Sequence, residues 1–205
     1  RRQRQMCIRD RPYTVRKARV VVREMAESAA LDLLDKRMVT DQLVLTIGYD
    51  TASLSNEDAR TTYKGEVTTD YYGRKVPKHA HGTANLESPT SSARLISEAV
   101  MELFDRIVNP KLLVRRINLT TNHVVDEETA AKNPSPVQYD LFTDYEALER
   151  KQREEKERLA KERQIQTAIL NIKKQFGKNA ILKGLNYEEG ATAKERNEQI
   201  GGHKA

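Results

Sequence analysis

The sequence predicts an α+β protein in which an antiparallel sheet carries two helices on one face. Three observations predict this fold class: two stretches with apolar residues at helical spacing, three stretches that alternate apolar and polar residues, and their order along the chain. That order is helix, strand, strand, helix, strand. A first strand within residues 1–11 would complete a β-α-β-β-α-β arrangement, and we expect that strand to lie inside the sheet, paired on both sides.

The composition limits how much of the chain is compact. Of the 205 residues, 38% are hydrophobic, 5% aromatic and 32% charged. A chain this polar cannot bury its whole length, so we expect one compact domain in residues 12–126 and extended segments after it. The single cysteine, Cys7, excludes a disulfide framework, and no apolar run reaches the roughly 18 residues of a membrane span. These features favour a cytoplasmic protein without membrane contact.

The positive charge is concentrated at the start of the chain. The formal net charge is +6, and residues 1–11, RRQRQMCIRDR, hold five Arg against one Asp, which is +4 of that total. The stretch QMCIRDR resembles a translated sequencing adapter, so we expect a non-native or truncated start. The charge of these residues is therefore no argument for binding a polyanion.

The first helix is predicted from Val15 to about Lys36. Pro12 and Tyr13 precede it, and Thr14 is placed to cap its N-terminus. Apolar residues recur every three to four positions, which aligns them on one side of the helix. The expected core stripe is Ala18, Val21, Val22, Met25, Ala29 and Leu33.

Three alternating stretches predict strands, because residues two apart lie on the same side of a strand. They are QLVLTIGYD at 42–50, HAHGTANL at 79–86 and LLVRRINLTTN at 112–122. The polar stretch 50–78 between the first two contains a hairpin around DYYGRK, where Asp70 is read as a turn residue. The residues expected on the helix-covered face are Leu43, Leu45, Ile47, Tyr49, Ala80, Gly82, Ala84, Leu86, Ile117 and Leu119.

The second helix is predicted in SPTSSARLISEAVMELFDRIV, residues 88–108. Thr90 is the expected N-cap, and Pro110 ends the helix because proline cannot continue it. The helix connects the second and third alternating stretches. Its expected core stripe is Leu95, Ala99, Leu103 and Ile107.

After the sheet domain the composition changes. Residues 127–145 are predicted to be a linker, 146–176 a long charged helix ended by Gly177, and 177–205 a tail that is weakly ordered by itself. Acidic residues stand four positions before basic ones, an order that stabilises an isolated helix. The later part of this helix carries an apolar edge of Ile165, Ile169, Ile172 and Phe176.

No convergent catalytic or metal-binding motif is present. His79 and His81 lie on the same side of a predicted strand and offer two metal ligands, but a zinc site uses three or four. Neither Cys7 nor His123 stands at a recognisable spacing from them. We interpret the two histidines as polar residues of an open sheet face and predict no metal and no catalytic residues.

The open sheet face is the first candidate site. Its predicted residues are small and polar and lie beside an arginine, which permits close approach of a phosphate chain without reading base edges. A merely solvated face is the alternative, and the pattern alone leaves both open. The absence of aromatic residues there disfavours base stacking. The candidate DNA-binding residues are Thr46, Gly48, Lys75, Lys78, Thr83, Asn85, Arg115, Arg116, Asn118 and Thr120.

The linker contains a second candidate site, QYDLF. A solvated connector seldom exposes a Leu-Phe pair, whereas a docking peptide does. This stretch resembles the peptide by which bacterial DNA polymerases and repair proteins bind the sliding clamp. The resemblance implies that Gln138 binds a pocket rim while Leu141 and Phe142 enter an apolar cleft. Tyr139 replaces the commoner Leu, and Asp140 stands at the Ser-or-Asp position. The alternative is that Leu141 and Phe142 pack on the protein's own domain.

The resemblance extends over most of the chain. The stretches RPYTVRKARVVVREMAESAALDLLDKRMVTDQLVLTIGYD, GEVTTDYYGRKVPKHAHGTANL and TSSARLISEAVMELFDRIVNPKLLVRRINLTTNHVVDE are similar to the little-finger domain of Y-family translesion DNA polymerases. QYDLFTDYE and the tail resemble the UmuC-like branch of Gram-positive bacteria. This resemblance implies a βαββαβ little-finger domain whose open face grips primer-template DNA, a sliding-clamp partner, and a nucleoid-associated protein of damage tolerance and the SOS response.

The resemblance does not cover a catalytic half. The palm, fingers and thumb of the family have no counterpart in the 205 residues, so Mg²⁺-dependent DNA synthesis is attributed to a parent polymerase and not to this chain, for which we predict no cofactor. Two other classes stay open. One is a free-standing clamp adaptor or nucleic-acid-binding module, and the other is a small ferredoxin-like enzyme such as an acyl-phosphate hydrolase.

Overall fold

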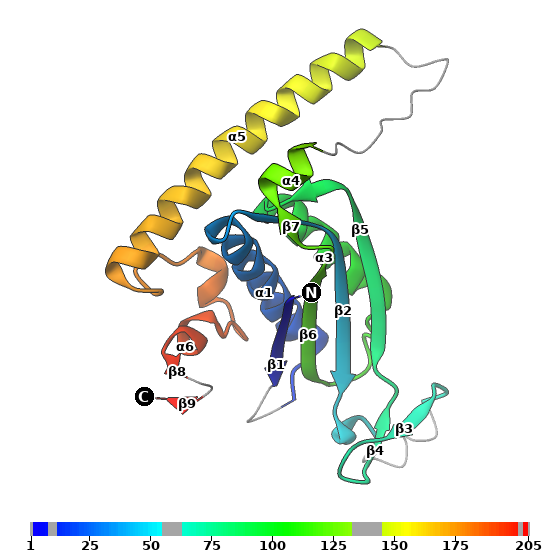
Figure 1. The fold of residues 1–205 in the computed structure, drawn as a ribbon. Helices are drawn as coiled ribbons and strands as arrows, with labels where there is room; N and C mark the ends of the chain where they lie inside the picture. Colours follow the sequence, from blue (N-terminus) through cyan, green and yellow to red (C-terminus); the bar gives the residue numbers. More distant parts are fainter. Residues whose placement is uncertain (1, 8–11, 55–62, 133–144, 201–202, 205) are drawn as a thin grey trace.

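The computed structural model describes residues 2–7, 12–54, 63–132, 145–200 and 203–204 (Figure 1). It contains a main sheet, helices packed against one face of that sheet, and a long helix that leads to a small C-terminal unit. The elements are β1 (Arg2–Cys7), α1 (Val15–Asp35), β2 (Met38–Tyr49), η1 (Thr51–Leu54), β3 (Val67–Thr69), β4 (Lys75–Pro77), β5 (Ala80–Thr90), α3 (Ala93–Ile107), β6 (Val114–Asn122), β7 (Val125–Asp126), α4 (Glu127–Lys132), α5 (Tyr145–Phe176), η2 (Gly184–Tyr187), α6 (Ala193–Asn197), β8 (Gln199–Ile200) and β9 (His203–Lys204).

The main sheet confirms the predicted α+β class, but its strand order corrects one expectation. The order is β1-β6-β2-β5 with every neighbouring pair antiparallel, and β7 extends the pairing of β2. Among the described residues β1 pairs with β6 alone, so it lies at the edge and the central strands are β6 and β2. The physical reason is the sequence of β1, RQRQMC, because charged strands suit a sheet edge.

Helices α1 and α3 cover the same face of the sheet, as predicted (Figure 1). Every residue of the predicted α1 stripe is buried, since α1 packs on the sheet and on α3 at once. The alternation in β2 and β6 is also confirmed, with Leu43, Leu45 and Ile47 fully buried opposite the helices. None of the described helices is apolar enough over the length needed to cross a membrane.

Helix α3 differs from the predicted second helix in its N-cap residue and in the residues that it buries. Ser92, not Thr90, is the N-cap, and its hydroxyl accepts a hydrogen bond from the backbone N–H of Leu95. Thr90 ends β5, and its hydroxyl accepts from the N–H of Ser92. The buried side is also rotated, because α3 is enclosed by the sheet and by α1. Of the predicted stripe only Leu103 is fully buried, and the core residues are Ile96, Val100, Met101, Leu103 and Phe104.

A glycine lies where side chains of α3 pack closely on the sheet. A Cβ at Gly82 would lie 2.8 Å from Leu103 Cδ1 and 2.9 Å from Ile107 Cγ2. Because real Cβ atoms do not approach this closely, a larger residue at position 82 would force the side chains of Leu103 and Ile107 to move. Gly82 therefore allows β5 to complete the covered part of the sheet.

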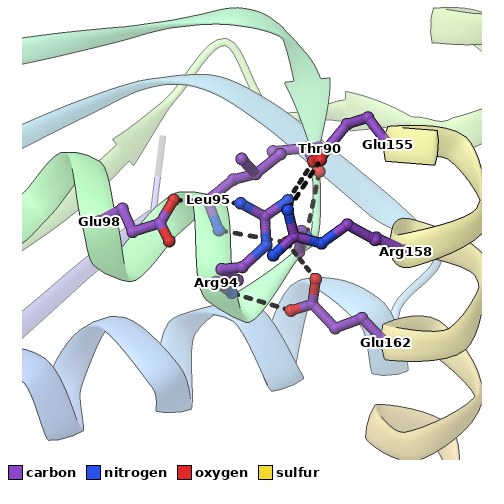
Figure 2. Close-up of polar contacts among 8 residues, drawn as sticks. Thr90, Arg94, Leu95, Glu98, Glu155, Arg158 and Glu162 are labelled. Atoms are coloured by element: carbon purple, nitrogen blue, oxygen red, sulfur yellow. Dashed lines mark hydrogen bonds and ion pairs between the residues drawn. The ribbon is translucent and has the colours of Figure 1, made fainter. Parts of the chain in front are cut away.

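The long helix predicted for residues 146–176 spans Tyr145–Phe176, and Gly177 follows it with a positive φ of 95°. It does not stand free, because its carboxylates bind the sheet domain. Glu162 accepts hydrogen bonds from Ser92 Oγ (2.7 Å) and from the backbone N–H of Arg94 (2.8 Å), which caps α3 a second time. Figure 2 shows Glu155 and Glu162 of α5 converging on Arg94. The segment predicted as linker begins as α4, whose Glu127 binds Arg163 of α5 in a bidentate pair.

The tail, expected to be weakly ordered by itself, packs against α1. Glu24 of α1 is 3% exposed, and its carboxylate accepts hydrogen bonds from Asn186 Nδ2 (2.8 Å) and the backbone N–H of Thr192 (2.9 Å). Arg196 Nη2 lies 3.4 Å from the same carboxylate. Burial lowers the pKa of the Arg196 guanidinium, although the charge of Glu24 acts in the opposite direction. We name these four residues the Glu24 cluster.

Candidate nucleic-acid interface

The candidate interface is the face of the main sheet that α1 and α3 leave uncovered. It is built by every second residue of β5, β2 and β6, because side chains alternate between the two faces of a strand. Register brings these residues into rows across the sheet. The rows pair Gly48 with Arg116, Thr46 with His81 and Asn118, Val44 with Thr83 and Thr120, and Gln42 with Asn85 and Asn122.

The face gathers seven of the predicted candidate residues in one place. Each lies on a strand whose opposite side is packed against the helices, so the alternation that buries the core places this set on the other face. Thr120 is nevertheless buried there, at 4% exposure, while the other six are at least partly exposed. Its members are Thr46, Gly48, Thr83, Asn85, Arg116, Asn118 and Thr120. None of the described residues on this face of β2, β5 and β6 is Phe, Tyr or Trp. The rows therefore present mostly amides, hydroxyls and backbone, together with the guanidinium of Arg116, the imidazole of His81 and the aliphatic side chain of Val44.

Hydrogen bonds between strands hold the polar side chains in place. Gln42 Nε2 donates to Asn85 Oδ1, and Asn122 Nδ2 donates to Gln42 Oε1, each over 3.0 Å. The hydroxyl of Thr46 lies 2.9 Å from Nδ1 of His81. Sequence reasoning missed Gln42 and Asn122 as members of the face. The period of two, continued by one more step along each strand, would have found both.

Arg116 is the principal charged group of the face. Its side chain is exposed, and among the described residues no carboxylate lies within 4.0 Å of its guanidinium. Opposite it stands Gly48, where a Cβ would be 3.2 Å from Arg116 Cβ. The glycine thus leaves room beside the arginine and exposes backbone there. An anion could approach this end of the face closely.

Arg115 does not join Arg116. The register shifts between Gly48 and Tyr49, so a bulge separates Arg115 from the alternating pattern. Its Nε lies 3.6 Å from the Asp50 carboxylate, which offsets its charge. The predicted contribution of Arg115 to the same surface therefore has no support in its position.

Lys75 and Lys78 lie on the β3–β4 hairpin and not among the rows of the face. Lys75 Nζ donates to Thr69 Oγ1 over 2.9 Å, and Lys78 Nζ forms a 2.6 Å ion pair with Glu66. The hairpin continues from the end of the sheet at which β2 finishes and β5 begins (Figure 1). These two lysines extend the candidate surface only if a ligand reaches beyond the sheet.

Two further predictions concern the clamp-binding motif and the absence of a metal site. The residues of the clamp-binding motif, Gln138, Tyr139, Asp140, Leu141 and Phe142, lie outside the described residues. Within the described part of the chain no group of three or more His, Cys, Asp or Glu residues could hold a metal ion. The described carboxylates are not grouped as the magnesium site of a polymerase requires.

Comparison with family models identifies the family of the chain. Residues 9–135 match the family model described as the impB/mucB/samB family C-terminal domain. The match covers more than half of the chain and includes α1, α3, α4 and all strands of the main sheet except β1. No curated protein matches the chain.

Proposed function

The chain belongs to the impB/mucB/samB family, whose C-terminal domain it contains, and from this premise we propose that its open sheet face grips the sugar-phosphate backbone of DNA. The family is that of Y-family translesion DNA polymerases, so membership implies DNA binding and a role in DNA repair. The observation that carries the proposal is Arg116, exposed without a described carboxylate partner and standing beside Gly48 on a face of amides and hydroxyls.

The chemistry of the face favours phosphate over bases. Amide, hydroxyl and backbone N–H groups donate to phosphate oxygens, and a guanidinium adds a charge-assisted bond. Thr46, Thr83 and Asn118 are too short to reach far into a groove, so they position a duplex without reading its sequence. Hydrogen bonds between strands keep Gln42, Asn85 and Asn122 in place before DNA arrives, which lowers the ordering cost of binding.

Charge reversal at Arg116 tests this proposal. Arg116→Glu in the full chain is expected to weaken binding to a fluorescent duplex at least about tenfold at low salt, because a charge-assisted contact becomes a repulsion. Arg153→Glu is the matched control, since it makes the same charge change on an exposed position of α5. Equal affinities of the two variants, as measured by fluorescence anisotropy, would mean that net charge and not the sheet face attracts the DNA.

A second function is favoured by the linker sequence. We propose that QYDLF, residues 138–142, binds the bacterial sliding clamp and that the chain falls in the UmuC-like branch of Gram-positive bacteria. The support is the resemblance of the motif and of the tail, together with the spacing of Gln138, Leu141 and Phe142. A clamp-bound peptide and a DNA-gripping face would act on the same DNA, because the clamp encircles the duplex.

A further inference from the structure

The tip of the β3–β4 hairpin exposes two tyrosines side by side. Tyr71 is 97% exposed and Tyr72 is 76% exposed, in the turn between the two strands. Their rings meet edge to face with centroids 5.5 Å apart. A solvated turn gains nothing from two neighbouring aromatic rings, whereas rings of this size supply large contact area to a ligand.

The turn that carries the rings is well ordered by local hydrogen bonds. Asp70 Oδ1 accepts from the backbone N–H groups of Tyr72 and Arg74, each at 2.9 Å, and Asp70 Oδ2 accepts from Arg74 Nε at 2.8 Å. Gly73 completes the turn with a φ of 75°. These contacts hold the two rings at the tip, so little conformational entropy is lost when a ligand binds them.

The hairpin carries an excess of positive charge. From residue 63 to 78 the net charge is +2, from the exposed cations Lys64, Arg74, Lys75 and Lys78 and the carboxylates Glu66 and Asp70. Arg74 pairs with Asp70 and Lys78 with Glu66. The guanidinium of Arg74 lies over the ring of Tyr72, 5.2 Å from its centroid. Aromatic rings flanked by cations are typical of surfaces that bind single-stranded nucleic acid, where bases stack on rings and phosphates contact the cations.

The hairpin is fixed at the end of the sheet where Arg116 stands. β4 packs against η1 and against the end of β2, and η1 begins three residues after Gly48. A strand of DNA that leaves a duplex on the sheet face at this end would pass toward the hairpin (Figure 1). The sheet face itself offers no Phe, Tyr or Trp among its described residues, and Tyr49 at this end of β2 is buried, so the hairpin tip supplies exposed rings there.

We propose that Tyr71 and Tyr72 form a stacking platform for unpaired bases of single-stranded DNA, next to the duplex that the sheet face binds. The duplex part of this statement rests on the proposed function, but the stacking part rests on the hairpin alone. A protein-binding hot spot fits the tip less well, because such a site needs apolar neighbours and the exposed surroundings here are mostly charged.

The test compares single-stranded DNA with an abasic strand of equal length, about 12 nucleotides, by fluorescence anisotropy on the full chain. Replacing both tyrosines by Ala is expected to weaken binding of the normal strand at least about fivefold, in line with the stacking energy of one or more bases. Replacing both by Phe keeps the rings and should preserve affinity. Tyr187→Ala is the matched control, because Tyr187 is 71% exposed but lies in η2 of the tail.

The outcomes separate stacking from charge and from the sheet face. Stacking predicts that the abasic strand binds the wild-type chain and the double Ala variant equally, and that duplex affinity is unchanged in the double Ala variant. The proposed function predicts that Arg116→Glu weakens duplex binding, whereas stacking predicts that the effect of the tyrosines on the single strand persists in that variant. An unchanged single-strand affinity in the double Ala variant, or the same loss on the abasic strand, overturns the proposal. If the double Ala variant keeps its affinity for the single strand but loses binding to the sliding clamp, the two tyrosines contact a protein and the stacking proposal is overturned.

Discussion

Glu24→Ala is expected to destabilise the docked tail by about 3 kcal/mol, because the substitution leaves buried donors without an acceptor. Asn186 Nδ2 and the backbone N–H of Thr192 would both lose the carboxylate oxygen that they reach in the folded protein. Arg196 would lose its counter-charge as well. Removal of one member of a buried polar cluster costs more than the cluster contributes, since the remaining members stay desolvated.

The loss should appear first as opening of the tail. The tail can leave α1 without unfolding the sheet, so a decrease of about 3 kcal/mol raises the open population about 100-fold and accelerates tryptic cleavage at Lys183, Lys194 and Arg196 accordingly. Glu98→Ala is the matched control, because Glu98 also pairs with an arginine on a helix but is exposed, and exposed pairs contribute little. Equal cleavage rates in the wild-type chain and the Glu24 variant would show that the tail is not held by this cluster.

Replacing Leu141 and Phe142 together by Ala is expected to weaken binding to a bacterial sliding clamp by at least about 2 kcal/mol, or roughly 30-fold. In the proposed complex these two side chains fill an apolar cleft, and anchors of this kind dominate the binding energy of a short peptide. Isothermal titration of the full chain with purified clamp measures the change. Ile165→Ala combined with Phe176→Ala is the matched control, because both residues are exposed and apolar but lie on α5.

The same experiment decides between the clamp and the alternative in which the pair packs on the protein itself. Packing on the protein's own domain predicts unchanged clamp affinity and a lower unfolding temperature of the double variant. Clamp docking predicts the reverse, with lost affinity and an unchanged unfolding temperature. An unchanged titration would exclude QYDLF as the anchor.

Periodicity predicted the elements that form the core. The α1 stripe and the alternating residues of β2 and β6 depend on local spacing, and a residue's side of a helix or strand follows from that spacing alone. The open face followed for the same reason, since its residues are the other half of the same alternation. These parts of the fold and of the candidate interface were readable because nearest neighbours along the chain determine them.

Features that depend on contacts between distant segments were not predictable. Glu24 lies beside the α1 stripe and reads as a solvated residue, because the tail that buries it comes more than 160 residues later. The edge position of β1 depends on strand pairing, because β6 has β1 on one side and β2 on the other, and spacing along the chain does not determine that order. The bulge that directs Arg115 to Asp50 shows only in the pairing register. Local spacing predicted only a hairpin around DYYGRK, and the exposure of its two tyrosines became visible in the structure.

The central claim is that the sheet face holds DNA by its backbone and not by its bases. The most direct measurement is the affinity of the full chain for duplexes of unrelated sequence over a salt series from about 50 to 200 mM. Backbone contacts predict that affinity falls roughly tenfold or more over this range, that the duplexes differ by much less, and that Arg116→Glu lowers the salt slope by roughly one or more. Discrimination among duplexes that exceeds the loss caused by salt would contradict the account.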